Sequence, residues 1–206
     1  VLSDKIFLWM VVDKNALGHY SYTSRIRCSC KTIKKIILDC DPGHDDAVAI
    51  MLAAASNQIK ILGITCVAGN ATLDNTKLNS LKICSLIDRT DINIYSGADK
   101  PLKYDLVTAE HIHGKSGLDI EGSSIEIYHN YKINEMHAVD FIIQACHENI
   151  DPIYLCPTGP LTNIALALKK DPTIANKIKE IMENVVTLEV PNKVDYECGP
   201  NWGNIK

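Results

Sequence analysis

Several features that would assign the chain to a special class are missing from its sequence. No apolar run is long enough to span a bilayer, so an ordinary transmembrane helix is excluded. There is no internal repeat and no low-complexity run. The formal charge of -4 at pH 7 gives no electrostatic reason to expect nucleic acid or a membrane surface as a partner. With 46% hydrophobic and 22% charged residues, the composition is typical of a globular protein.

A C-x-x-C pair is also missing, although the chain contains eight cysteines. Cys40, Cys66 and Cys156 fall in or at the ends of apolar runs that predict buried strands. We therefore expect the cysteines to be small core residues in a reducing compartment, and neither disulfides nor zinc ligands. A cytoplasmic location follows as the expectation.

Residues 1–32 are expected to form a disordered N-terminal extension. The short apolar run at 6–12 resembles the core of a signal peptide, but an aspartate flanks it on each side and no small-residue cleavage site follows. Arg25, Arg27 and several serines in an acid-free stretch resemble some organelle transit peptides. Both targeting functions remain alternatives to a disordered tail.

From residue 33 onward, apolar runs of strand length alternate with helical patterns. The segment Gly97–Asn134 has no clear period and is long for a connector, which indicates a functional loop. This order predicts an α/β domain with a mostly parallel sheet and helices on both faces. The predicted strands are Ile33–Asp39, Lys60–Val67, Ile92–Tyr95, Asp151–Cys156 and Val185–Val190, and the predicted helices are Asp45–Ser56, Leu73–Arg89, Met136–Glu148, Leu161–Lys169 and Asp171–Glu180.

An acidic stretch joins the first predicted strand to the first predicted helix. It contains Asp39, Asp41, Asp45 and Asp46, with Pro-Gly supplying a sharp turn. Two carboxylates about 5 Å apart repel by about 3 kcal/mol at an effective dielectric constant near 20, so four together favour a bound cation. Oxygen ligands suit calcium first and magnesium second. An EF-hand is excluded, because the sixth position from Asp39 is His44 rather than glycine.

Polar residues also follow two other predicted strands. Asn70 follows the predicted strand Lys60–Val67, and Thr158 follows the strand that ends at Cys156. Ligands of open parallel sheets bind beyond the carboxyl ends of the strands. We therefore expect Asn70 and Thr158 to lie beside the acidic turn, although each has an alternative role as a turn residue or a helix cap.

These segments together resemble the inosine–uridine-preferring nucleoside hydrolases, calcium enzymes that split a ribonucleoside into free base and ribose. The resemblance is carried by KIILDCDPGHDDAVA at 35–49, GITCVAGN at 63–70, HIHG at 111–114 and PTGPLTN at 157–163. It implies a Rossmann-like core and runs from about Lys34 to about Ile181. Residues 33–206 are accordingly expected to be the N-terminal part of such a domain, truncated at the C-terminus.

The resemblance also implies roles for individual residues. Asp41 would bind Ca²⁺ and act as the general base on a calcium-bound water. Asp46 and the backbone carbonyl of Thr158 would be further calcium ligands. Substrate would contact Asp45 and Asn70 through the ribose hydroxyls, His113 on a loop that closes over it, and Asn204 in a Gly-Asn pair. Asp39 would support these residues without contacting the ion or the substrate itself. His44 would start the helix, with its side chain directed away from the site. Full-length members are expected to form homo-oligomers.

Some family features do not occur in this sequence. Residues 183–195 lack the Glu-Phe-Asn stretch that binds ribose in the family, and the adjacent His and Asp that supply the last ligand and the leaving-group acid are absent. This leaves open an inactive, truncated homologue that binds calcium or ribose, or that pairs with an intact subunit. A haloacid-dehalogenase type of phosphatase also places D-x-D after its first strand. The second aspartate pair, Asp45 and Asp46, argues against that enzyme.

Overall fold

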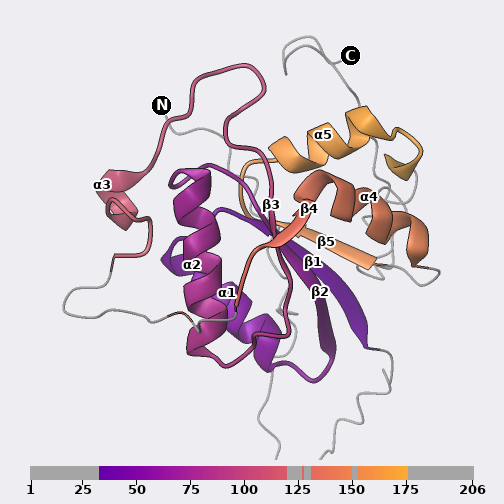
Figure 1. The fold of residues 1–206 in the computed structure, drawn as a ribbon, viewed down its shortest axis with the longest axis horizontal. Coiled ribbons are helices and arrows are strands. Elements are labelled where there is room, and N and C mark those ends of the chain that lie inside the picture. Colours follow the sequence, from indigo (N-terminus) through magenta and orange to yellow (C-terminus); the bar gives the residue numbers. More distant parts are fainter. Residues whose placement is uncertain (1–32, 120–126, 128–130, 150–152, 176–206) are drawn as a thin grey trace, which may run out of the picture.

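The computed structural model describes residues 33–119, 127, 131–149 and 153–175 (Figure 1). Strands and helices alternate along most of this part of the chain, as the sequence pattern predicts. Its strands are β1 (Lys34–Cys40), β2 (Ile59–Cys66), β3 (Ile94–Ser96), β4 (Asn134–His137) and β5 (Ile153–Pro157), and its helices are α1 (His44–Ala55), α2 (Leu73–Leu86), α3 (Glu110–His113), α4 (Ala138–Glu148) and α5 (Thr162–Lys170).

The strands form one sheet in the order β4-β3-β2-β1-β5, and every neighbouring pair is parallel. This confirms the predicted parallel α/β fold. The first strand, β1, lies inside the sheet between β2 and β5. Its residue Asp39 is paired with Thr65 on one side and with Pro157 on the other. The loops that follow β1, β2 and β5 therefore leave the sheet at the same edge.

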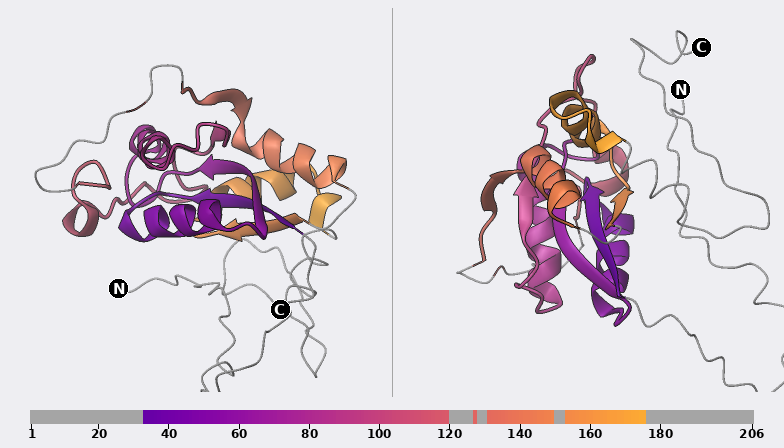
Figure 2. Two further views of the ribbon diagram at one scale, coloured as in Figure 1. Left: turned by 90° about the horizontal axis from the view of Figure 1, so that it is seen from below. Right: turned by 90° about the vertical axis from the view of Figure 1, so that its right-hand side faces the viewer.

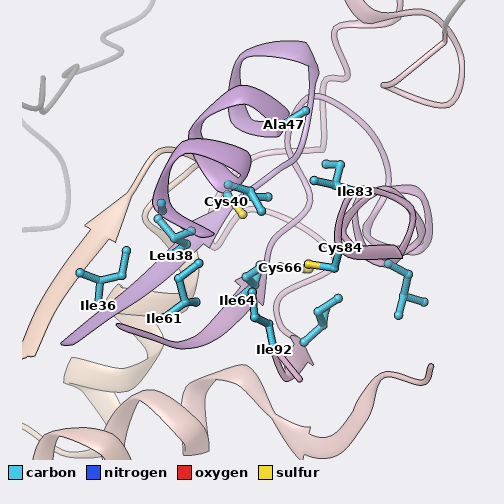
Figure 3. Packing of buried hydrophobic residues seen from close by; sticks show 14 of the residues in the cluster. Ile36, Leu38, Cys40, Ala47, Ile61, Ile64, Cys66, Ile83, Cys84 and Ile92 are labelled. Atoms are coloured by element: carbon cyan, nitrogen blue, oxygen red, sulfur yellow. The ribbon is translucent and has the colours of Figure 1, made fainter. Parts of the chain in front are cut away.

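Helices cover both faces of the sheet, with α1 and α2 on one face and α4 and α5 on the other (Figures 1 and 2). Successive side chains of β1 point alternately to the two faces of the sheet, as expected for a pleated strand. Leu38 belongs to the buried apolar cluster on the α1 and α2 side, together with Ala47 of α1 and Ile83 of α2 (Figure 3). The neighbouring residue Ile37 packs with Ile142 on the opposite side. Burial on both faces holds β1, and hence the turn after it, in a fixed position.

Two predictions about the middle of the chain were incomplete. The predicted helix at Met136–Glu148 begins only at Ala138, because Asn134–His137 forms the edge strand β4. This strand is mostly exposed and has the polar sequence NEMH, so it lacks the apolar alternation by which strands are recognised. The predicted loop Gly97–Asn134 contains the short helix α3.

Other predictions fall partly or wholly outside the described residues. These are the extension at 1–32, the strand Val185–Val190 and the second half of the helix Asp171–Glu180. In the first half of that helix, Ile174 and Ala175 are helical. Within the described part of the chain, no helix combines the length and the apolar character that a membrane crossing requires.

Candidate functional site

The acidic turn lies at the sheet edge where the sequence pattern placed it, and its four carboxylates have different environments. Asp39, Asp41 and Asp46 are buried, with exposed fractions of 0%, 4% and 4%. Asp45 is exposed. Asp39 is the last residue but one of β1, whereas Asp45 and Asp46 occupy the first turn of α1, where the helix dipole favours negative charge. Three buried carboxylates in one turn require compensating partners.

Two neighbouring side chains donate hydrogen bonds to the Asp39 carboxylate. Its Oδ1 atom accepts hydrogen bonds from Thr65 Oγ1 at 2.6 Å and from Asn163 Nδ2 at 2.8 Å. Its Oδ2 atom is buried and accepts no hydrogen bond from any described residue. Burial, with a smaller contribution from the nearby charge of Asp46, raises the pKa of Asp39 to about 6 despite these two hydrogen bonds.

Asp41 is held by the loop that follows β2. The backbone N–H of Asn70 donates to Asp41 Oδ2 at 2.6 Å, and the Asn70 side-chain amide donates to the Asp41 backbone oxygen at 3.1 Å. Two glycines enclose the carboxylate. A Cβ at Gly69 would lie 2.2 Å from Asp41 Oδ2, and one at Gly159 would lie 2.8 Å from Oδ1. The glycines of both flanking loops are therefore needed to let the carboxylate into this position.

Thr158 lies next to the same strand end. Its backbone N–H donates to the Asp39 backbone oxygen at 2.9 Å, so the loop after β5 is joined to the end of β1. The Thr158 side chain is exposed. Asn70 and Thr158 are thus both brought to the acidic turn, one on each side of β1, as the topology argument predicted.

The loop that carries α3 packs against the acidic turn. Ala109 N–H donates to the Asn70 backbone oxygen at 2.9 Å, and Asn79 Nδ2 donates to both the Pro42 and Ser116 backbone oxygens, at 3.0 and 2.8 Å. The His113 ring lies against Gly43, where a Cβ would be 2.8 Å from His113 Nδ1. The predicted functional loop therefore brings His113 to the site.

One prediction about this region was wrong, and one lies outside the structure. His44 does start α1, but its ring does not point away from the site, because it contacts His113. Asn204 lies outside the described residues.

Sequence reasoning gave no role to three buried polar residues that organise the site. Thr65 and Asn163 bind Asp39, and Asn79 joins the acidic turn to the α3 loop. All three are 0% exposed. A polar residue inside or beside an apolar run is the signal that could have identified Thr65 and Asn163, since buried polar groups are nearly always hydrogen-bonded. Asn79 gave no such signal, because the sequence of α2 around it is rich in polar residues.

The donor set fits a hard divalent cation, because the turn offers buried carboxylate oxygens and Asp39 Oδ2 receives no hydrogen bond from the described residues. In the described part of the chain, no group of three or more His, Cys, Asp or Glu side chains is arranged to hold a metal ion. A cation here therefore needs ligands of other kinds as well, such as a backbone carbonyl.

Similarity to known proteins agrees with this architecture. Residues 36–183 match the family model described as inosine-uridine preferring nucleoside hydrolase. A pyrimidine-specific ribonucleoside hydrolase of Escherichia coli K12 is 45% identical over 149 residues, which cover 72% of this chain and 46% of the relative. The chain thus spans about half the length of the curated relatives it matches.

Solved structures show the same likeness. A purine-preferring ribonucleoside hydrolase from Gardnerella vaginalis matches with a TM-score of 0.64 and 35% identity, over 70% of this chain and 46% of the other. A plant nucleoside hydrolase matches with a TM-score of 0.64 and 33% identity, over 70% and 45%. The chain belongs to the inosine–uridine preferring nucleoside hydrolase family.

Proposed function

We propose that the protein hydrolyses the N-glycosidic bond of ribonucleosides in a Ca²⁺-dependent reaction. The observation that carries this proposal is the cluster of buried carboxylates Asp39, Asp41 and Asp46 at the carboxyl end of β1. In this proposal Asp41, Asp46 and the Thr158 carbonyl hold the ion, and Asp39 supports them from behind. Bound Ca²⁺ would offset the negative charge of the turn and acidify a water molecule.

Asp41 is the proposed general base. The short hydrogen bond from the Asn70 N–H to Oδ2 fixes the orientation of this buried carboxylate before substrate arrives. Asp41 takes a proton from the attacking water, whose oxygen bonds to the anomeric carbon of ribose. The departing base takes the electron pair of the broken glycosidic bond. The nearby carboxylates stabilise positive charge on the sugar as the bond breaks.

The proposed ribose contacts lie at the same edge of the sheet as the acidic turn. Asp45 is exposed at the start of α1 and can accept hydrogen bonds from ribose hydroxyls. Asn70 uses its amide nitrogen on Asp41, and its amide oxygen accepts no hydrogen bond from the described residues, which leaves that oxygen for a hydroxyl. His113 and Asn204 are the further proposed contacts. Fixing the sugar in this way positions the anomeric carbon for attack.

The proposal includes homo-oligomer formation and a cytoplasmic location. The cytoplasmic location is supported by the five described cysteines, which form no disulfide with one another and of which four are buried.

The test is ribose release from uridine and from inosine, measured as reducing sugar with Ca²⁺ or with a chelator. We expect hydrolysis only with Ca²⁺, and a loss of about 100-fold or more in Asp41→Asn, because a general base contributes at least this factor. The control is Asp91→Asn, which changes an exposed carboxylate bound by Arg89.

Full activity in Asp41→Asn would refute the assignment of the base. Calorimetric binding of Ca²⁺ and ribose without any ribose release would instead favour a binding module that does not turn over substrate.

A further inference from the structure

The two outer strands of the described sheet, β4 and β5, have very different sequences. At one edge, β4 has the polar sequence NEMH and is mostly exposed. At the other edge, β5 has the sequence IYLCP, which contains no charged residue, and four of its five residues are only half-buried. Natural edge strands are usually protected from further pairing by charged side chains. An uninterrupted apolar run is instead typical of a strand inside a parallel sheet. The sequence of β5 therefore fits an inner strand better than an edge strand.

Only one side of β5 is paired in the described part of the chain. Its residues pair with Lys35–Asp39 of β1, and no other described strand adjoins it. The backbone groups of a strand point to both of its sides, so those on the far side of β5 can pair with a further strand. Tyr154 and Cys156 add apolar side chains that are only partly buried against the α1 and α2 cluster.

Helix α1 has a second uncovered apolar surface. From Ala47 to Ala55 its sequence AVAIMLAAA contains no polar residue, so the side that faces away from the sheet is apolar as well. Val48 and Leu52 lie one turn apart on that side and are 55% and 60% exposed. The neighbouring helix α2, in contrast, carries Lys77 and Lys82. A helix that is apolar all round is normally buried, so the outer face of α1 is built to be covered.

These two surfaces lie on the same side of the molecule. The strand order places β5 beside β1, the strand that leads into α1, whereas α2 leads from β2 to β3. Both views in Figure 2 show α1 and β5 along one side of the molecule. Tyr154 and Cys156 of β5 pack against the same cluster as Ala47 and Ile50 of α1. One partner can therefore cover both surfaces.

The similar proteins indicate which partner this is. The match covers 46% of the Gardnerella vaginalis hydrolase and 46% of the Escherichia coli K12 relative, so more than half of each protein lies outside the match. We propose that the β5 edge and the outer face of α1 form a docking surface for this complementary part of a nucleoside hydrolase, supplied as a separate polypeptide. The partner adds a strand beside β5 and covers Val48 and Leu52 with apolar side chains.

A second copy of the chain fits this surface less well. Two copies that pair through β5 would extend the sheet, but the outer face of each α1 points away from its own sheet. Val48 and Leu52 would stay exposed in such a dimer. A partner with a different surface can cover the strand edge and the helix together.

The test is co-expression of the full chain, carrying an affinity tag, with the part of the Escherichia coli K12 relative that lies outside the 149 matched residues. We expect the two polypeptides to co-purify in about equal amounts. Leu52→Lys should reduce the co-purified partner by about 10-fold or more, because it places a charge in the middle of an apolar contact. The matched control is Leu86→Lys on α2, where the leucine is 57% exposed, and this variant should retain the partner.

Hydrogen exchange tests the strand edge without any substitution. Relative to the chain alone, we expect the complex to show slower exchange in Ile153–Pro157 and unchanged exchange in Asn134–His137 at the opposite edge. Exchange in β5 that is equally slow in the chain alone would mean that this edge is already covered, and would overturn the proposal.

Three other results would also overturn it. These are the absence of the partner from the purified wild type, equal retention of the partner by Leu52→Lys and Leu86→Lys, and a dimer of the chain alone that Leu52→Lys dissociates. Circular dichroism of the two variants checks that both are folded. The assay involves no substrate, so its failure and a failure of the proposed hydrolysis are separate results.

Discussion

At the scale of single residues, Asn163 organises the site by joining four segments. Its amide nitrogen donates to Asp39 Oδ1 and to the Cys66 backbone oxygen, and its amide oxygen accepts from the Ala98 N–H at 2.8 Å. The residue is fully buried at the start of α5. Asn163 therefore links the ends of β1, β2 and β3 to the helix that follows β5. Its contribution is structural, but it acts on a carboxylate of the proposed metal site.

We predict that Asn163→Ala lowers the free energy of unfolding by about 2–4 kcal/mol, because it leaves several buried polar groups without partners. Urea unfolding followed by circular dichroism measures this change. The matched control is Asn75→Ala, which removes one exposed hydrogen bond to the Lys115 backbone oxygen and should change stability by less than about 1 kcal/mol. Equal losses in both variants would contradict the role assigned to Asn163.

The raised pKa of Asp39 predicts an unusual pH dependence in the metal-free protein. Burial raises this pKa from 3.8 to about 6, so between these two values the folded protein keeps a proton that the unfolded chain has released. The free energy of unfolding should therefore fall as the pH rises from about 4 to about 6, by about 3 kcal/mol at most.

Urea unfolding of the chelator-treated protein at several pH values checks this. Asp39→Asn removes the titrating group and should flatten that part of the curve. If the free energies of unfolding of the wild type and of Asp39→Asn differ by a constant amount over the whole pH range, Asp39 does not titrate as described.

At the scale of secondary-structure elements, α4 and α5 cover the face of the sheet opposite α1 and α2. The face of α4 that packs against the sheet contributes Ile142, which is fully buried together with Ile37 of β1. The next residue, Ile143, is only half-buried. Because β1 carries Asp39, packing by α4 supports the acidic turn from a distance.

We predict that Ile142→Ala destabilises the protein by about 2–5 kcal/mol, since it removes apolar contacts and leaves a cavity. Ile143→Ala is the control and should have a smaller effect, because less apolar surface is buried there. Thermal unfolding of the two variants provides the comparison. A larger loss in Ile143→Ala would show that the packing face of α4 has been assigned incorrectly.

Those elements with strong local patterns could be predicted from the sequence. The apolar run of β1 is followed directly by the acidic turn, so one short stretch of sequence indicates both the strand and the carboxylates at its end. The strand β4 was missed because it is a polar edge strand. The contacts of Asn163 with Asp39 and of His44 with His113 join residues 124 and 69 positions apart, and no local pattern reports such contacts. The parallel topology did predict that Asn70 and Thr158 would meet the acidic turn, because it determines which loops share an edge.

At the scale of the whole molecule, the proposed ion would couple to folding, because its proposed ligands come from the acidic turn and from Thr158, which is more than a hundred residues away in the chain. We predict that Ca²⁺ at 100 times its dissociation constant raises the free energy of unfolding by about 2.7 kcal/mol. The thermal midpoint should rise with CaCl₂ and fall with a chelator, and Mg²⁺ should have a smaller effect because it demands a stricter octahedral geometry.

Two neighbouring variants make this test specific. Asp46→Asn changes a buried carboxylate and should lose the response to Ca²⁺, whereas Asp45→Asn changes an exposed one and should keep it. A response that disappears in Asp45→Asn and persists in Asp46→Asn would contradict the proposed ligand set.

The distance in sequence between Asp39 and Asn163 has a consequence for protein synthesis. On the ribosome, β1 emerges early, but its partner strand β5 and the amide that binds Asp39 are made more than a hundred residues later. Until then, the nascent chain carries its acidic turn next to an unpaired strand edge, which is a site for pairing with other chains. This edge of the nascent protein is therefore exposed to misassociation until residue 163 has left the exit tunnel.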